Sequence, residues 1–298
     1  MLRTFFEREW LSYLSWLIMI GVNVAIMIAA FAYRYILGQY DQYAHLLVNY
    51  RDGFLKRALI GEIVSFFYYP TVPKWLTYGL GTAIWLVALV LFLLAFRRII
   101  GFTERNLPLF ALMFCSPAFL KNFIESLGYF DVYGCVAALI LLLIPARSFL
   151  YVVLAGAMAS ILILIHHIHL LMYLPTIAMI VVIRYYCAQP LTPLRIIGGA
   201  VFVVPVAVTF LLSQFYGSPQ MSEADFHALL QSRMTVPGAK IFTNMWYLEF
   251  DEEVRRTWRE MPKNAPRIPV YFALLAAHWP LIRSFRDNLR LLDRKSVV

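Results

Sequence analysis

A cluster of charged residues between two long apolar segments is the first candidate for chemistry in this sequence. Residues 41–62 contain two aspartates, a glutamate, a histidine, an arginine and an adjacent Lys-Arg pair. A carboxylate can accept a proton as a general base, and a fixed guanidinium beside an ammonium group suits a phosphate. We therefore take two residues as catalytic candidates, Asp41 and Asp52, and three as substrate-binding candidates, Arg51, Lys56 and Arg57.

The first half of this stretch has the pattern of an amphipathic helix. If residues 41–52 are helical, Asp41, His45 and Asp52 fall within an arc of about 40°, and the opposite side carries Tyr43, Leu46, Leu47 and Tyr50. This pattern predicts one helix along the membrane surface, with its carboxylates turned to water. Its ends would lie roughly 16 Å apart, so the two aspartates could not serve one reacting atom together. Gly53 is expected to end the helix.

Lys56 and Arg57 do not sort onto a polar face, because Ile60, Ile63 and Phe67 share their side. Cations among apolar neighbours either reach water or meet an anion. One interpretation is a structural ion pair, Asp52 with Lys56 or Arg57 with Glu62. The other is a clamp for a phosphate or pyrophosphate, and the sequence leaves both open.

Further ionisable residues near apolar segments are candidates for substrate binding, because burying such groups is costly. They are Asp131, His166, His167 and His169. The His-His-Ile-His run lacks the i, i+4 spacing of a zinc helix, and no cysteine joins it. We therefore predict no cofactor, although a divalent metal remains possible, and a packing role for the histidines is an equal alternative.

Composition places these residues in a membrane protein. The chain has 298 residues, of which 61% are hydrophobic and 14% charged. Its apolar runs reach the roughly 20 helical residues that cross a bilayer, and they are continuous rather than alternating. This predicts an all-α, polytopic bundle of about eight transmembrane helices. The net charge of +9 suits anionic headgroups or lipid phosphates, and we expect no nucleic-acid partner.

The expected spans cover most of the chain, which we treat as a single membrane domain, 1–298. They are 10–33, 75–96, 107–120, 131–145, two short helices within 149–183, one ending near 212, and 268–282. Within 149–183 a single long helix broken at Pro175 is the alternative to a turn at the histidines. Arginines before the first span and after the second predict cytoplasmic termini, which places two long loops outside, 34–74 and 213–266. The second loop should contain a helix capped by Ser222, and forms either an interfacial lid or a solvated connector.

The chain resembles the GT-C glycosyltransferases, membrane enzymes that use polyprenyl-phosphate-linked sugars. The resemblance rests on Asp41-Gln42, soon after the first span and within a long first outer loop of surface helices, where that superfamily keeps its acidic catalytic residue. The stretches RDGFLKRALIGE and HHIHLLMYLP also look like segments of bacterial membrane proteins of surface-polysaccharide assembly, including polymerases.

This resemblance implies transfer of a sugar from a polyprenyl-linked donor to a glycan, lipid or protein acceptor. The reaction would take place at the extracytoplasmic face of a bacterial inner membrane, in contact with the bilayer. Two other functions stay open, a transporter or flippase of lipid-linked glycan and a non-catalytic subunit of an envelope assembly complex. Ionisable groups gathered at one face, without an internal repeat, favour an enzyme over a transporter.

Overall fold

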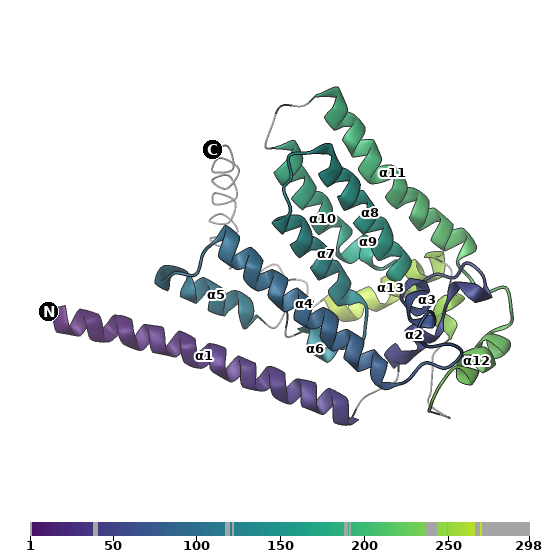
Figure 1. The fold of residues 1–298 in the computed structure, drawn as a ribbon, viewed down its shortest axis with the longest axis horizontal. Coiled ribbons are helices and arrows are strands. Elements are labelled where there is room, and N and C mark those ends of the chain that lie inside the picture. Colours follow the sequence, from purple (N-terminus) through teal and green to yellow (C-terminus); the bar gives the residue numbers. More distant parts are fainter. Residues whose placement is uncertain are drawn as a thin grey trace.

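The described part of the protein is an all-α fold of helices joined by turns and loops, with no β-strand among the described residues (Figure 1). The computed structural model describes residues 2–37, 41–116, 120, 122–187, 190, 192–236, 243–248, 250–265 and 269. Its α-helices are α1 (Leu2–Leu37), α2 (Ala44–Leu47), α3 (Leu59–Ser65), α4 (Trp75–Ile99), α5 (Leu107–Phe114), α6 (Asn122–Glu125), α7 (Asp131–Leu143), α8 (Phe149–Ile165), α9 (His169–Met172), α10 (Leu174–Val181), α11 (Pro193–Tyr216), α12 (Glu223–Ser232) and α13 (Phe250–Asn264). Short 3₁₀ turns cover Asp41–Tyr43, Tyr50–Asp52, Glu104–Asn106 and Asn244–Trp246, and a π-helical turn, Val182–Tyr186, extends α10.

Three of the described helices are long and apolar enough to cross a membrane. They are α4, α11 and the Tyr13–Ile36 part of α1. The chain is therefore a membrane-associated helical protein. The helices α7, α8 and α10 are apolar but shorter, so the predicted count of about eight spans and the placement of both termini in the cytoplasm remain predictions. The predicted last span, 268–282, lies outside the described residues except for residue 269.

The turn at the histidines is confirmed, and the single long helix through Pro175 is not found. The backbone of His166 is extended, with φ −162° and ψ 114°, which ends α8. A second short helix, α10, then starts at Leu174 with Pro175 in its first turn, where a missing amide hydrogen costs nothing. The apolar run therefore folds back on itself and carries the histidines at the connection.

Close backbone approaches hold the bundle together. Along the pair α8 and α11, a Cβ on Gly156 would lie 3.1 Å from the carbonyl oxygen of Val201. Where α4 passes the start of α7, a Cβ on Gly81 would lie 2.6 Å from the amide nitrogen of Gly128. The approach at Gly81 excludes a side chain and that at Gly156 leaves little room for one, so these glycines allow the close spacing of the helices.

Arginines gather at one end of the bundle, which we call the arginine end. The guanidinium of Arg98, in the last turn of α4, donates to the carbonyl oxygen of Leu143. Arg184 donates to the carbonyl oxygens of Leu141 and Ile144. These contacts satisfy carbonyl groups that have no partner within α7 at its C-terminal end.

The opposite end, which we call the site end, collects segments that are far apart in the sequence. It contains the connection between α1 and α4, which we call the first connection. It also contains the residues just before α7, the turn between α8 and α10, and the segment after α11 (Figure 1). The amide of Lys56 donates to the carbonyl oxygen of Gly217 over 2.8 Å, and the amide of Val72 donates to that of Arg233 over 2.9 Å. The first and the last of these segments are therefore directly joined.

The prediction of one surface helix over residues 41–52 is wrong. The segment consists of a 3₁₀ turn, the four-residue helix α2, two extended residues and a second 3₁₀ turn. All four residues of α2, Ala44, His45, Leu46 and Leu47, are buried. His45, expected on the polar face, and Leu46 and Leu47, expected on the apolar face, are thus all covered by protein, and the segment is part of the core. Gly53 does end the second turn, and its φ of 109° is one that glycine adopts readily.

Candidate functional site

Four buried or nearly buried histidines form the centre of the site end, and we call them the histidine cluster. They are His45, His166, His167 and His169. The ring centroid of His166 lies 6.0 Å from that of His45, 5.4 Å from that of His167 and 6.1 Å from that of His169. His45 comes from the first connection and the others from the turn between α8 and α10, so the cluster joins two segments about 120 residues apart.

Arg57 lies beside this cluster in a conformation that is uncommon for a residue with a side chain. Its φ is +63°, the left-handed region, and its side chain is buried. The guanidinium lies 3.5 Å from Nδ1 and 3.2 Å from Nε2 of His167, measured from Nε and one terminal nitrogen respectively. Strained backbone of this kind persists only where the surroundings fix it, and it is frequent at functional sites.

Lys56 is a second cation that the fold removes from water. Its side chain is only 2% exposed, and its ammonium group donates to the carbonyl oxygen of Leu248. The backbone amide of the same residue bonds to Gly217. Two adjacent residues therefore place positive charge in the interior of the site end, where charge interacts more strongly than in water.

Several polar atoms in this region are buried and have no hydrogen-bond partner among the described residues. They include Nδ1 of His45 and the indole nitrogen of Trp246. The ring of Trp246 lies 5.4 Å from that of His45. Buried polar groups are almost always satisfied, so a group of such atoms in one place indicates capacity to bind a polar molecule or water.

Three histidines of the cluster, His45, His166 and His169, are held in the neutral form. Burial, followed by the positive charge of Arg57, lowers the pKa of His45 to about 3. Burial also lowers the pKa of His169 to about 4. For His166 the pKa is lowered well below its ordinary value, again chiefly by burial and then by Arg57. Near neutral pH each of these rings can therefore donate one hydrogen bond and accept another.

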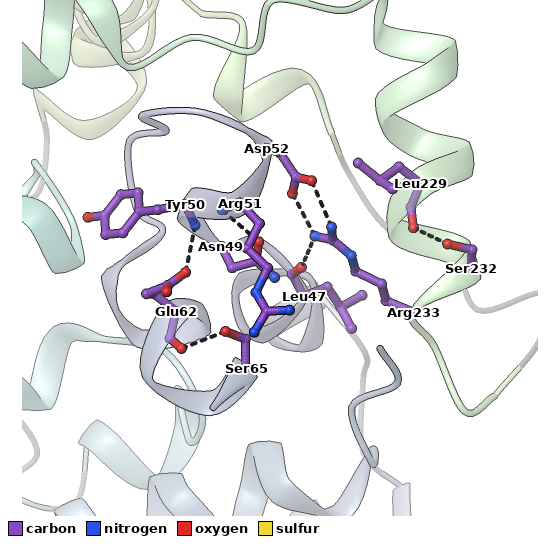
Figure 2. Close-up of polar contacts among 10 residues, drawn as sticks. All are labelled: Leu47, Asn49, Tyr50, Arg51, Asp52, Glu62, Ser65, Leu229, Ser232 and Arg233. Carbon is purple, nitrogen blue, oxygen red and sulfur yellow. Dashed lines mark hydrogen bonds and ion pairs between the residues drawn. The ribbon is translucent and has the colours of Figure 1, made fainter. Parts of the chain in front are cut away.

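Asp52, a predicted catalytic residue, forms the ion pair that joins α12 to the first connection. Its two carboxylate oxygens accept hydrogen bonds from Arg233 over 2.7 and 2.8 Å, and Arg233 also donates to the carbonyl oxygen of Leu47 (Figure 2). Both side chains of the pair are largely buried. Among the described residues, the ion pair of Asp52 is with Arg233 rather than with Lys56, and Glu62 accepts a hydrogen bond from the amide of Tyr50. Asp52 is thus held in place by a residue 181 positions away.

The remaining predicted residues lie at the same end of the bundle. Asp41 starts the 3₁₀ turn before α2, and its side chain lies outside the described residues. Asp131 is the first residue of α7. Burial, then Cys135, then Asp131 raise the pKa of Tyr173, whose ring lies 5.5 Å from that of His169. Arg51 is exposed, and its guanidinium stacks 3.9 Å from the ring centre of Tyr69.

The structure therefore brings together Arg57 and the three predicted histidines, with Lys56 next to Arg57 in the chain and Asp131 near Tyr173. It leaves Arg51 at the surface. Within the described ranges, no group of three or more histidine, cysteine, aspartate or glutamate side chains has a geometry that could hold a metal ion.

Three residues of the site were not identified from the sequence, namely His45, Arg233 and Trp246. His45 was assigned to the polar face of a helix that does not form. Arg233 and Trp246 lie in the loop after α11, and no local pattern shows that they meet residues 45–52. Comparison of the chain with family models, with curated proteins and with solved structures gives no match.

Proposed function

We propose that this chain is a membrane glycosyltransferase or glycan polymerase. It would move a sugar from a polyprenyl-phosphate-linked donor to a glycan, lipid or protein acceptor at the extracytoplasmic face of a bacterial inner membrane. The observation that carries the proposal is the burial of two adjacent cations, Lys56 and Arg57, at the site end of a membrane-associated helical bundle, with Arg57 against His167 of the histidine cluster. A phosphate carried by a lipid is an anion that such a group of donors would recognise.

The buried polar atoms of the cluster add support. A sugar presents hydroxyl groups that both donate and accept hydrogen bonds, and neutral histidines can do the same. Trp246, whose indole nitrogen is unpartnered among the described residues, adds an aromatic surface next to His45. Sugar and phosphate would thus each find matching groups.

In the proposed reaction, an oxygen of the acceptor hydroxyl forms a bond to the anomeric carbon of the donor sugar. The bond between that carbon and the phosphate oxygen breaks, and its electron pair leaves with the polyprenyl phosphate. Asp41 accepts the proton of the acceptor hydroxyl. Lys56 and Arg57 offset the charge that develops on the leaving phosphate. Asp52 is the weaker candidate for the base, because both of its oxygens are engaged by Arg233.

A binding experiment tests the phosphate part of the proposal. Purified protein in detergent or nanodiscs is titrated with farnesyl phosphate, with farnesol as the control that lacks the anion. We expect binding of the phosphate only, and its loss in Arg57→Gln and Lys56→Gln. Asp251→Asn, which removes an exposed ion pair with Arg255 on α13, is the matched control that should bind normally. Equal binding of phosphate and alcohol would contradict the proposal.

A transfer experiment tests the reaction. The purified chain is incubated with lipid-linked sugars extracted from the source membranes, and incorporation of labelled sugar into acceptor is measured. Asp41→Asn should abolish transfer while leaving farnesyl phosphate binding intact. Transfer by the purified chain alone would also exclude a non-catalytic subunit. Full activity of both Asp41→Asn and Asp52→Asn, in correctly inserted protein, would show that the catalytic assignment is wrong.

A further inference from the structure

The helix α13, Phe250–Asn264, carries apolar residues on one side and charged residues on the other. At about 100° per residue, the apolar Val254, Trp258 and Met261 fall within an arc of about 60°. Trp258 is 65% exposed and Met261 is 45% exposed. An exposed tryptophan and methionine on one stripe of a helix indicate that this stripe meets a partner.

The other side of the same helix is strongly charged. It carries Glu252, Arg255, Arg259 and Lys263, all of them exposed, and Asp251 lies at the edge of the apolar stripe. Asp251 and Arg255 form an exposed ion pair of 2.6 Å. A helix with this density of charge cannot cross a bilayer core, but it can lie at the surface of one.

The position of α13 in the chain places its start close to the membrane-length helices. Leu248, two residues before α13, accepts the hydrogen bond from the ammonium group of Lys56. The amide of that same lysine bonds to Gly217, the residue that follows α11. One lysine therefore connects the start of α13 to the end of a helix that is long and apolar enough to span the membrane.

Exposed aromatic residues mark the level of the bilayer surface at this end. The last turns of α1 and α11 and the first turn of α4 carry Tyr33, Tyr35, Trp75, Phe215 and Tyr216, each more than half exposed. Aromatic side chains concentrate at membrane-water boundaries, where their rings suit the headgroup region. The start of α13 is joined directly to the part of the protein that carries this belt.

We propose that α13 lies in the plane of the bilayer surface at the site end, with Val254, Trp258 and Met261 inserted at the boundary between headgroups and acyl chains. The partner is the lipid bilayer rather than a protein. The charged side of the helix faces headgroups and water. Because the segment immediately before α13 places the ring of Trp246 5.4 Å from that of His45, contact of α13 with lipid would hold that segment against the histidine cluster.

Site-directed spin labelling tests this placement independently of any enzymatic activity. Single cysteines are placed at 258 and 261 on the apolar side and at 252 and 259 on the charged side, in full-length protein whose Cys115, Cys135 and Cys187 have been replaced by alanine. The protein is reconstituted in vesicles that contain phosphatidylglycerol. Collision with oxygen, which is concentrated in lipid, is compared with collision with a water-soluble nickel complex.

We expect a several-fold higher oxygen-to-nickel ratio at 258 and 261 than at 252 and 259. Equal ratios at all four positions would overturn the proposal by placing the helix in water. Low accessibility to both reagents at 258 and 261 would also overturn it, because protein would then cover the stripe.

A second measurement needs no cysteine replacement. Tryptophan fluorescence is recorded in vesicles whose lipids carry bromine near the headgroup end of the acyl chains, for the natural chain and for Trp258→Phe. We expect the variant to lose a quenched component of the emission. An unchanged quenched fraction would contradict insertion of Trp258. Since neither measurement depends on sugar transfer, failure of this proposal and failure of the proposed function are separable.

Discussion

At the scale of single residues, Arg233 is a point where one side chain fixes two segments. It holds both carboxylate oxygens of Asp52 and the carbonyl oxygen of Leu47, and it is 5% exposed. Removing one member of a buried pair leaves the other charge without compensation. The contact between the end of α12 and the first connection should therefore be lost when Arg233 is substituted.

We predict that Arg233→Ala destabilises the folded protein by about 3 kcal/mol, a typical cost for breaking a buried pair from one side. The measurement is thermal unfolding of detergent-solubilised protein, followed by intrinsic fluorescence. Arg255→Ala is the matched control, because its pair with Asp251 is exposed and contributes at most about 1 kcal/mol. Equal effects of the two substitutions would show that burial of the Asp52 pair is unimportant.

The histidine cluster predicts that stability falls in acid. The pKa of His45 is lowered to about 3 and that of His169 to about 4, against the ordinary value of 6.5 for histidine. The unfolded chain therefore binds more protons than the folded chain between pH 6.5 and these values. Stability is complete above pH 6.5 and decreases by about 1.4 kcal/mol per histidine for each pH unit below it.

Unfolding temperatures measured between pH 7.5 and pH 4.5 should show this loss. The variant His45→Gln, which cannot gain the proton, is expected to have a shallower dependence on pH than the natural chain. His227→Gln on α12 leaves the cluster intact and is the control. An identical slope for His45→Gln and the natural chain would show that His45 does not titrate on unfolding.

The sequence allows candidate site residues to be selected by their type, but it does not allow their contact partners to be predicted. Lys56, Arg57 and the three histidines could be selected because ionisable groups among apolar residues are unusual. The contact of Asp52 with Arg233 spans 181 positions, and that of Lys56 with Leu248 spans 192. No helical or strand period connects residues so far apart, so the tertiary fold alone reveals these pairs.

At the scale of elements, the packing of α3 on residues 45–48 leaves no room for a side chain at Gly61. A Cβ there would lie 1.8 Å from the carbonyl oxygen of Val48 and 3.1 Å from that of His45. Both neighbours are backbone atoms, which cannot rotate away. The position of His45 therefore depends on a glycine in a different helix.

We predict that Gly61→Ala destabilises the protein by about 2 kcal/mol or more, because α3 would have to move away from residues 45–48. Gly21→Ala in α1 is the matched control, since no atom lies within 4 Å of its added Cβ and alanine favours a helix. Thermal unfolding compares the two. A Gly61→Ala protein as stable as the Gly21→Ala protein would contradict this packing.

Element boundaries could be predicted where one local feature decides them. The starts of α4 at Trp75, α5 at Leu107, α7 at Asp131 and α12 after Ser222 agree with the sequence, because apolar length, proline and capping act locally. The prediction of one amphipathic helix over residues 41–52 is wrong because His45 and Leu47 are both buried against distant segments of the chain. Helical period describes one partner surface, and this segment has protein on both sides.

At the scale of the whole molecule, the two ends of the bundle should face opposite sides of the membrane. The site end carries Phe54 and Ile168 as exposed residues, and the arginine end carries Phe102. The natural Cys187, which follows the π turn after α10, is also exposed. These four positions allow the predicted orientation to be tested.

We predict that cysteines at 54 and 168, in a Cys187→Ser background, react with a membrane-impermeant maleimide in intact cells. Cys187 of the natural chain, and a cysteine at 102, should react only after the membrane is permeabilised. Labelling is read by mass shift on gels. The reverse pattern would place the site end in the cytoplasm and remove the extracytoplasmic part of the proposed function.

The short length of α7 sets the depth of the histidine cluster. Arg98 ties the end of α4 to the end of α7, yet α4 has 25 residues and α7 has 13. At their other ends, Gly81 of α4 already meets Gly128, six residues or about 9 Å inward from Trp75. The ring of His45 lies 5.1 Å from that of Phe130, two residues after Gly128. On the bilayer placement proposed above, the cluster is therefore recessed below the aromatic belt, and a soluble molecule would have to descend into the headgroup layer to reach it. An amphiphile already anchored in that leaflet could approach sideways, with its polar group at the right height.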